Sequence, residues 1–326
     1  MAPDSLATVI RRIRDLRFVV LGAYVADCFV ATSRLPAWGV EYGADSVHVS
    51  PGGKGLNQAV ALARLGARVT AIGTVGGDAL GHDILSTLTR EGVEVECMLM
   101  REHAATSVCV CFVSRKGETS FVSHIADDVA VTSDAVRAAE AVIQQADAVL
   151  ITFELPLAAI REAIALASRC EAPVFLQPAP PLADLGGYAI IPWNQVHVLV
   201  PNKIEALAIL QGMGSDRTNQ TSDLAAELAA ELTAPAVVVT LGESGCIAHA
   251  DGSSRRYPAH PAVPVDTTGA SDGFVACLAA FTLAGASEAD AIEAALAAAA
   301  WTIGRPGGHQ AMPFSAQLIG MLSQPR

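Results

Sequence analysis

The regular alternation of short apolar segments with longer helical patterns constrains the fold of this chain most strongly. Apolar runs rich in β-branched residues predict strands at 18–24, 69–72, 148–152, 173–177, 196–200 and 236–240. Amphipathic or alanine-rich patterns predict helices at 58–65, 80–91, 133–145, 156–168, 203–211, 222–232, 271–285 and 288–303. Near-continuous apolar strands are typical of a parallel sheet that helices cover on both faces. The alternation therefore predicts an α/β body.

Three segments depart from this alternation. Residues 108–113 and 120–123 predict two strands joined by a turn at 115–118, which indicates a hairpin without helices. A polar stretch containing glycine and proline occupies residues 27–49, and a short amphipathic helix is expected at 6–16. We therefore expect a small β element attached to the α/β body.

Composition excludes several classes of protein. Hydrophobic residues make up 52% of the 326, with a mean hydropathy of +0.40, so the chain can build a large core. The longest apolar stretches, 274–286 and 294–303, fall short of the roughly 20 residues that a membrane span requires. The net charge of -12 argues against nucleic acid and anionic membranes as partners.

The N-terminus and the cysteines indicate a cytoplasmic protein. Arg11 and Arg12 precede an apolar stretch, as in an export signal, but Asp15 and Asp27 interrupt that pattern. The 7 cysteines are odd in number and form no C-x-x-C pair, so a disulfide framework or zinc site is not indicated. We expect free thiols, which are typical of a reducing compartment.

Residues 266–272 (DTTGASD) predict an anion site. A Gly-Ala-Ser turn that opens a helix presents unpaired backbone N–H groups and the positive end of the helix dipole, which suits phosphate. Asp272 falls in the first turn, where its carboxylate is placed to accept a proton from a hydroxyl group that attacks the phosphoryl group. The alternative is an ordinary helix start that Thr or Ser caps.

Three further segments are candidate ligand sites. Residues 52–57 (GGKGLN) form a glycine-rich turn before a helix, Asn202 and Glu205 follow the strand at 196–200, and Thr240 and Gly242 follow the strand at 236–240. Each has a simpler interpretation, namely a tight turn with a capping Asn, or a helix start with a solvated Glu. Neither G-x-x-x-x-G-K-[ST] nor G-x-G-x-x-G occurs in the chain.

Taken in order, these segments resemble the signatures of the PfkB carbohydrate kinase family, and most closely its ribokinase branch. Residues 51–60 resemble the first family signature and residues 266–272 the second, about 215 residues later. Residues 202–205 resemble the N-x-x-E motif, and residues 305–308 resemble the segment beside the monovalent-cation site. The resemblance extends over about residues 17–315.

The resemblance implies an ATP-dependent sugar kinase with a three-layer α/β/α ribokinase-like fold, a mostly parallel central sheet and a small β-sheet lid. The expected divisions are an N-terminal helical extension at 1–16, a kinase body at 17–26, 50–92 and 126–326, and a lid at 27–49 and 93–125. A homodimer formed through the lid is also implied. The implied acceptor is a primary hydroxyl group of a small sugar, with a ribose-like furanose favoured.

Site residues are implied at the positions that match the family motifs. Asp272 is the implied general base, with phosphoryl binding by the amides of Gly269, Ala270, Ser271 and Asp272. The sugar is implied to contact Asp27, Gly52, Gly53, Lys54, Asn57 and Glu154. ATP is implied to approach Asn202, Glu205, Thr240, Gly242 and Gly245. Mg²⁺ is implied to bind through water to Asn202 and Glu205, and K⁺ to lie near Asp266, Thr268, Ile303 and Gly308.

Five positions depart from the family pattern: Val25, Lys203, Ser271, Gly273 and Ala311. Ser271 replaces a usual glycine, which introduces strain only if that position needs a positive φ. Val25 replaces an asparagine that contacts sugar in ribokinases, and the loss of this donor and acceptor changes which sugar hydroxyl groups can be bound. The alternatives are a kinase for a nucleoside, another sugar or a sugar acid, and a sugar-binding regulator without turnover.

Overall fold

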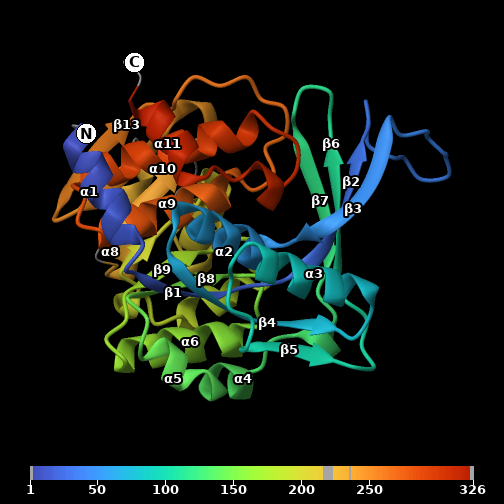
Figure 1. The fold of residues 1–326 in the computed structure, drawn as a ribbon, viewed down its shortest axis with the longest axis horizontal. Helices are drawn as coiled ribbons and strands as arrows, with labels where there is room; N and C mark the ends of the chain where they lie inside the picture. The colour runs from blue at the N-terminus through green and yellow to red at the C-terminus, as the bar shows by residue number, and fades with distance from the viewer. Residues whose placement is uncertain (1–2, 216–222, 235, 324–326) are drawn as a thin grey trace.

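The computed structural model describes residues 3–215, 223–234 and 236–323 (Figure 1). Its larger sheet has nine strands in the order β13-β12-β11-β10-β9-β8-β1-β4-β5. Their bounds are β1 Arg17–Leu21, β4 Arg68–Gly76, β5 Met98–Arg101, β8 Ala148–Thr152, β9 Val174–Gln177, β10 Val198–Leu199, β11 Ala236–Thr240, β12 Cys246–Ala250 and β13 Ser253–Tyr257. All the pairings from β5 to β11 are parallel, so the expected mostly parallel sheet is confirmed.

Strands β12 and β13 extend the sheet by an antiparallel hairpin that the sequence analysis did not predict. The turn between them contains Asp251 (φ 49°) and Gly252 (φ 73°). Two consecutive positive φ angles are typical of a tight two-residue hairpin turn, for which Asp-Gly is a favoured pair. The Asp-Gly pair was therefore the sequence signal for this hairpin.

Helices cover both faces of the larger sheet, as Figure 1 shows. Helices α1 (Pro3–Ile13), α2 (Lys54–Leu65), α3 (Ala79–Arg90), α9 (Ala270–Leu283), α10 (Glu288–Ile303) and α11 (Ser315–Leu322) contribute to one hydrophobic core. Helices α4 (Ser133–Ala138), α5 (Glu140–Ile143), α6 (Leu157–Arg169), α7 (Lys203–Gly212) and α8 (Leu224–Leu232) contribute to the other. The three-layer α/β/α arrangement is confirmed.

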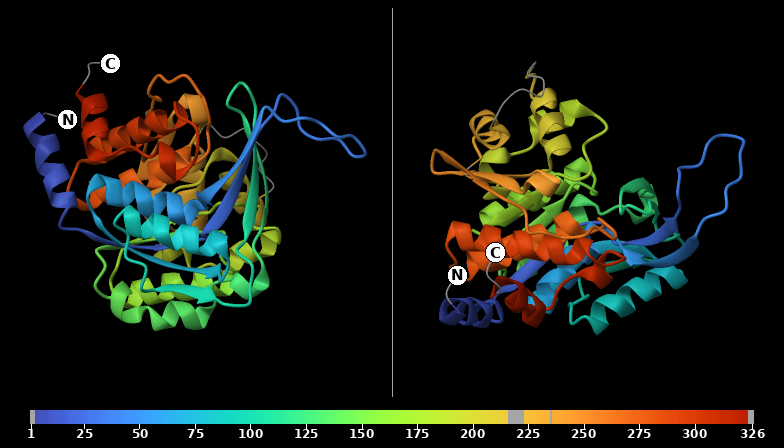
Figure 2. Two further views of the ribbon diagram at one scale, coloured as in Figure 1. Left: turned by 45° about the vertical axis from the view of Figure 1, so that its right-hand side comes forward. Right: turned by 90° about the horizontal axis from the view of Figure 1, so that it is seen from above.

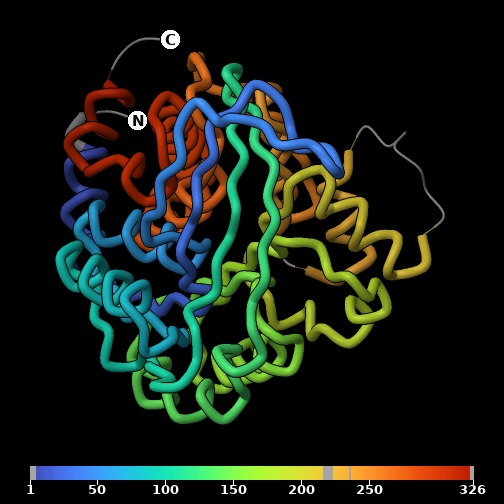
Figure 3. Tube along the Cα trace, turned by 90° about the vertical axis from the view of Figure 1, so that its right-hand side faces the viewer, coloured from blue at the N-terminus to red at the C-terminus, as the bar shows by residue number. Residues whose placement is uncertain are grey.

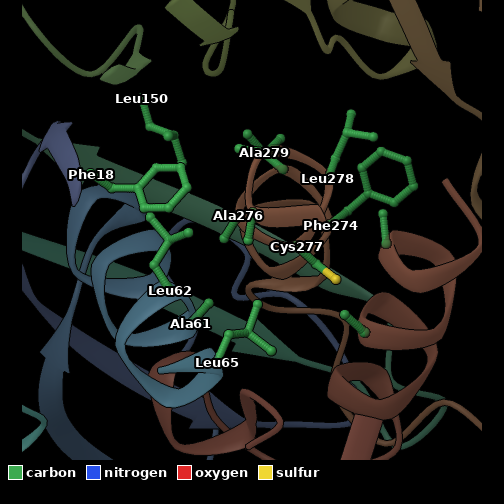
Figure 4. Packing of buried hydrophobic residues seen from close by; sticks show 14 of the residues in the cluster. Phe18, Ala61, Leu62, Leu65, Leu150, Phe274, Ala276, Cys277, Leu278 and Ala279 are labelled. Carbon is green, nitrogen blue, oxygen red and sulfur yellow. The ribbon is translucent and has the colours of Figure 1, made fainter. Parts of the chain in front are cut away.

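Alternation along the strands divides the apolar side chains between these two cores. In β1, Phe18 and Val20 belong to the core beneath α2 and α9, whereas Val19 and Leu21 belong to the opposite core. Figure 4 shows Phe18 close to Leu62 of α2, with the side chains of α9 packed alongside. This packing holds α2 and α9, whose first turns carry the candidate site, against the sheet.

Several element bounds differ from the sequence predictions. The helix expected at 133–145 is two short helices interrupted at Ala139, and the strand expected at 196–200 is shorter, with β10 spanning Val198–Leu199. Helix α11 was not predicted, and position 222 of the expected helix at 222–232 lies outside the described residues. Within the described part of the chain, no helix combines the length and apolar character needed to cross a bilayer.

The smaller sheet has four strands in the order β3-β2-β6-β7, with bounds β2 Val25–Ala31, β3 Ser46–Gly52, β6 Val108–Val113 and β7 Thr119–His124. Figure 3 shows the four strands side by side across one end of the molecule, and in Figure 2 the loop between β2 and β3 extends away from the body. We call this sheet the lid. The expected lid segment 93–125 was too long, because β5 pairs with β4 in the larger sheet.

Candidate active site

A cavity of about 510 Å³ lies between the lid and the carboxyl ends of the body strands. Ligands of open α/β sheets bind characteristically at this edge. Eleven of the predicted site residues line it: Asp27, Gly53, Lys54, Asn57, Glu154, Asn202, Glu205, Thr268, Gly269, Ser271 and Asp272. The lining does not include Gly52 or Ala270. The structure thus brings together residues from opposite ends of the chain in one cavity.

The start of α9 has the form expected of an anion site. Its N-cap is Gly269, with φ 77°, and no side chain caps the helix. Capping by Thr or Ser is therefore excluded. The amides of Gly269, Ser271 and Asp272 have no hydrogen-bond partner among the described residues, whereas that of Ala270 donates weakly to the Thr267 carbonyl at 3.4 Å.

Asp272 is buried beside these amides, with 2% of its surface exposed. Its Oδ2 accepts a hydrogen bond from Nδ2 of Asn57 at 2.8 Å. Its Oδ1 has no partner among the described residues, and neither does Oδ1 of Asn57. A buried carboxylate oxygen without a donor is unusual, and this one borders the cavity.

The glycine-rich turn places a second set of polar groups on the opposite side of the cavity. Gly52 packs directly against the Asp27 carboxylate, which leaves no room for a side chain at position 52. Oε2 of Glu154 accepts hydrogen bonds from the backbone amides of Lys54 at 3.1 Å and Ala23 at 3.2 Å. Glu154 therefore holds the start of α2 against the ends of β1 and β8.

Negative charge predominates around Lys54. Burial lowers the pKa of this ammonium group, but Asp272, Glu154, Glu205 and Asp27 outweigh burial and raise it. Burial is also the main cause that raises the pKa of Asp27, Glu154 and Glu205, each to about 7, and the charge of Asp272 contributes to all three. Four carboxyl groups thus share one ammonium group, which favours binding of an additional cation.

Asn202 and Glu205 form a reciprocal capping box at the start of α7. The Asn202 side chain accepts a hydrogen bond from the Glu205 amide at 2.9 Å, and the Asn202 amide donates to Glu205 Oε2 at 2.8 Å. Asn202 Nδ2 also donates to Glu205 Oε1 at 2.7 Å. Glu205 is buried, with 6% exposed. The alternative of a solvated Glu is therefore wrong.

A second cavity, of about 460 Å³, adjoins the first at Asn202. Its lining includes the predicted residues Thr240 and Gly242, together with Lys203 and Arg256. Gly245 is not part of this lining and packs instead beneath the carbonyl of Tyr257. Of the residues predicted to approach ATP, Asn202, Thr240 and Gly242 therefore line this cavity and Glu205 lines the first one, whereas Gly245 has a structural role.

A buried chain of polar side chains behind the anion site was not predicted from the sequence. Nε2 of Gln58 donates to Oε1 of Gln177 at 2.5 Å, and Nε2 of Gln177 donates to Oγ of Ser271 at 2.9 Å. This chain joins α2, the end of β9 and the first turn of α9. The available signal was a polar residue, Gln177, at the end of an apolar strand. Ser271 itself is helical and has no positive φ, so it introduces no backbone strain.

Asp266, which precedes α9, connects the anion site to the loop that follows α10. Oδ1 of Asp266 accepts a hydrogen bond from the Thr268 amide, and its Oδ2 accepts one from the Gly307 amide, both at 2.9 Å. The Ile303 carbonyl accepts hydrogen bonds from the amides of Val265 and Asp266, and the Gly308 carbonyl accepts one from Ala311. The carboxylate of Asp266 thus joins the two loops.

Comparison with known proteins agrees with this architecture. Residues 16–314 match the pfkB family carbohydrate kinase model. The chain is 31% identical to ribokinase of Schizosaccharomyces pombe, over 94% of this chain and 97% of that one, and 32% identical to ribokinase of Mus musculus, over 80% of each. The fold is similar to Arabidopsis thaliana ribokinase complexed with ribose and ATP, with a TM-score of 0.77, 24% identity, and coverage of 95% of this chain and 99% of that one.

Proposed function

The chain belongs to the pfkB family of carbohydrate kinases and is a phosphotransferase acting on an alcohol group, and from this premise we propose that it transfers the γ-phosphoryl group of MgATP to a primary hydroxyl group of a small, ribose-like sugar. The observation that carries the proposal is the geometry at the start of α9. There a carboxylate oxygen and three amides, none of which has a partner among the described residues, lie side by side at the border of the cavity between lid and body.

The sugar would occupy the cavity between the lid and the body. Asp27, Lys54 and Asn57 border it with charged and amide groups that bind sugar hydroxyl groups. Asn57 also donates to Asp272, so one side chain would link sugar binding to the base. Val25 lines the same cavity with an apolar side chain, which favours an acceptor that needs no polar partner there.

Asp272 is the proposed general base. A primary hydroxyl group within hydrogen-bond distance of its Oδ1 would transfer its proton to the carboxylate as the oxygen attacks phosphorus. The amides of Gly269, Ser271 and Asp272 would stabilise the charge on the transferring group, assisted by the helix dipole. Because a buried site excludes water, these donors act in a medium of low dielectric constant.

The second cavity is the proposed position of the nucleotide. It meets the sugar cavity at Asn202, so a bound triphosphate would reach toward the start of α9 from the side of Thr240 and Gly242. Lys203 and Arg256 supply positive charge in its lining. The complex of the Arabidopsis thaliana relative with ribose and ATP supports the proposal that both substrates bind this fold together.

The charges and donors of this site fit Mg²⁺. Four carboxyl groups share one ammonium group, and both oxygens of Glu205 already accept hydrogen bonds from Asn202. Contact through water rather than direct ligation fits these engaged oxygens, and Mg²⁺ characteristically keeps several waters. When bound, the ion would neutralise charge on the phosphate groups.

The donor set near Asp266 fits K⁺ less well. Both carboxylate oxygens of Asp266 accept hydrogen bonds from backbone amides, and the Ile303 carbonyl accepts two such bonds, whereas the Gly308 carbonyl accepts one and keeps a second lone pair. Only Oγ1 of Thr268 has no partner among the described residues. We therefore assign no step to K⁺. Whether K⁺ contributes is tested by comparing turnover with and without KCl.

We also propose a homodimer formed through the outer face of the lid. The side chains on this face, opposite the cavity, include exposed Val47, Val49, Val108 and Val122. Exposed apolar patches on a β-sheet favour association. The test is sedimentation analysis of Val122→Lys, which should shift the mass from dimer to monomer, with Ser168→Lys on the exposed face of α6, away from the lid, as control.

The experiment that tests the activity is an ADP-release screen over pentoses, hexoses, ketoses, sugar acids and nucleosides. Release that depends on a pentose supports the proposal, and release that depends only on a nucleoside would assign the chain to nucleoside kinases. Failure of every acceptor, despite measurable sugar binding, would favour the sugar-binding regulator. The helical conformation of Ser271 removes the strain that had supported that alternative.

A further inference from the structure

Two thiols and a carboxylate converge on the inner face of the lid. Cys109 and Cys111 are two residues apart in β6, so their side chains lie on the same face of the strand. Asp27 of the neighbouring strand β2 is paired with Cys109. Their ligand atoms all lie within 4.8 Å of one another, and all three residues border the sugar cavity. The proposed kinase chemistry uses neither thiol.

The spacing of the two sulfur atoms suits a tetrahedral metal site. Their Sγ atoms are 3.8 Å apart. Two thiolates that each bind zinc at about 2.3 Å in tetrahedral geometry are separated by about 3.8 Å. The two sulfur ligands therefore already have the spacing of a zinc site, and only the carboxylate would need to approach.

A disulfide between the same two cysteines is disfavoured. Same-face side chains two residues apart in a strand are about 6.6 Å apart along the chain. A disulfide requires Cβ atoms about 3.5–4.5 Å apart. Closing the bond would therefore distort β6, which is hydrogen-bonded to strands on both sides. Metal binding requires no such distortion.

The surrounding charges also favour a cation. Asp272 and Asp266 act electrostatically on Asp27, with Lys54 as the opposing positive charge. Cys111 is buried and Cys109 is half-buried, so a bound ion would be shielded on one side and open to the cavity on the other. A site with three protein ligands and one open position is typical of accessible zinc.

We propose that Cys109, Cys111 and Asp27 bind a thiophilic divalent cation, Zn²⁺ or Cd²⁺, which excludes the acceptor sugar from the cavity. Binding releases the two thiol protons to solvent and leaves the fourth position for water. The inference of a metal site at these three residues rests on their geometry and does not require the kinase proposal. The competition with sugar rests on the proposed function, which places sugar hydroxyl groups on Asp27.

The first test measures metal binding without any activity. Fully reduced protein is titrated with CdCl₂, and the thiolate-to-cadmium charge-transfer absorbance is followed. We expect saturation at one equivalent, and an affinity at least tenfold weaker in Cys109→Ala and in Cys111→Ala. The control is Cys170→Ser, which changes a half-buried thiol at the end of α6 and should bind as the native protein does.

Absence of the absorbance in the native protein would overturn the inference, and so would its full retention in Cys109→Ala. Circular dichroism of each variant establishes that a loss does not reflect unfolding. Because Cys109 is half-buried, its replacement should be tolerated even if that of buried Cys111 is not. Neither negative result would bear on the kinase proposal, which does not involve these thiols.

The second test concerns competition. Initial rates are measured in excess MgATP at buffered free Zn²⁺, with the acceptor that gives the highest turnover in the ADP-release screen. We expect the apparent KM for that acceptor to rise at least tenfold with kcat unchanged. For Cys109→Ala, the apparent KM for the acceptor should be the same with Zn²⁺ as without it. Metal binding without a change in KM would refute the exclusion of sugar.

Discussion

Replacing Asp272 by Asn tests the proposed base with little change of shape. The amide oxygen of Asn can still accept the hydrogen bond from Asn57, which is 2.8 Å long in the native protein. The other amide atom would occupy the place of Oδ1, where no described residue offers a partner. The substitution therefore removes the proton acceptor and keeps the packing.

The expected loss follows from the chemistry of general bases. Removing such a base lowers rates by about 10²–10⁴, equivalent to about 3–5 kcal/mol of transition-state free energy. We expect kcat in the ADP-release assay to fall by this factor and the KM for the acceptor to change little. The matched control, Asp83→Asn on the exposed face of α3, should leave both constants unchanged.

Stability separates this explanation from simple unfolding. Burial is the main cause that raises the pKa of Asp27, Glu154 and Glu205, and the charge of Asp272 contributes to each rise. Removing that charge relieves this repulsion and also removes an attraction to buried Lys54, so urea unfolding at pH 8 without ligands should show a stability close to that of the native protein for Asp272→Asn. Turnover within threefold of native in the folded variant would refute the assignment of Asp272 as base.

Three further predictions concern the same site. Gly269→Ala places a Cβ 2.8 Å from Met312 at φ 77°, so urea unfolding should show a loss of about 1–2 kcal/mol and kcat should fall; unchanged stability would contradict the strained conformation. Gln177→Leu leaves the polar groups on either side unpaired, so we expect a loss of about 1–3 kcal/mol and a lower kcat; a native kcat would show that the buried chain does not position α9. The free energy of unfolding without ligands should fall as pH rises from about 4 to about 7, because folding raises the pKa of three carboxyl groups from 3.8 or 4.5 to about 7 and their protonated forms are favoured in the folded protein. Urea titrations at pH 5 and pH 8 measure this slope, which should be shallower in Glu205→Gln; no difference between the two pH values would contradict burial of these groups.

The fold was predictable where local pattern and burial agree. Strand β8 has the predicted bounds, and helices α2 and α3 lie where their patterns placed them, because buried parallel strands and amphipathic helices leave strong periodic signals. Prediction was weaker where pairing decides the structure. Strand β5 joins the larger sheet through β4, and β2 and β3 form strands by pairing with each other, with β2 also paired to β6.

The candidate site was predictable as a set of residues but not as an arrangement. Glycine-rich turns and a polar residue after an apolar strand have local signatures, so Gly53, Asn202 and Asp272 could be chosen from the sequence. Burial could not be predicted in the same way. Glu205 is an example, since its capping box has a sequence pattern but its 6% exposure depends on packing against distant segments.

The amino-acid sequence by itself determined the order of strands and helices, the two glycine-rich turns and the resemblance to one kinase family. These properties depend on residue type and short-range spacing, which a single chain displays directly. Tertiary structure decided which distant groups meet. It placed Asn57 against Asp272, joined Gln58 to Ser271 through Gln177, and brought Asp27 beside two thiols of another strand. Such contacts depend on sheet order and register, which connect segments up to 215 residues apart.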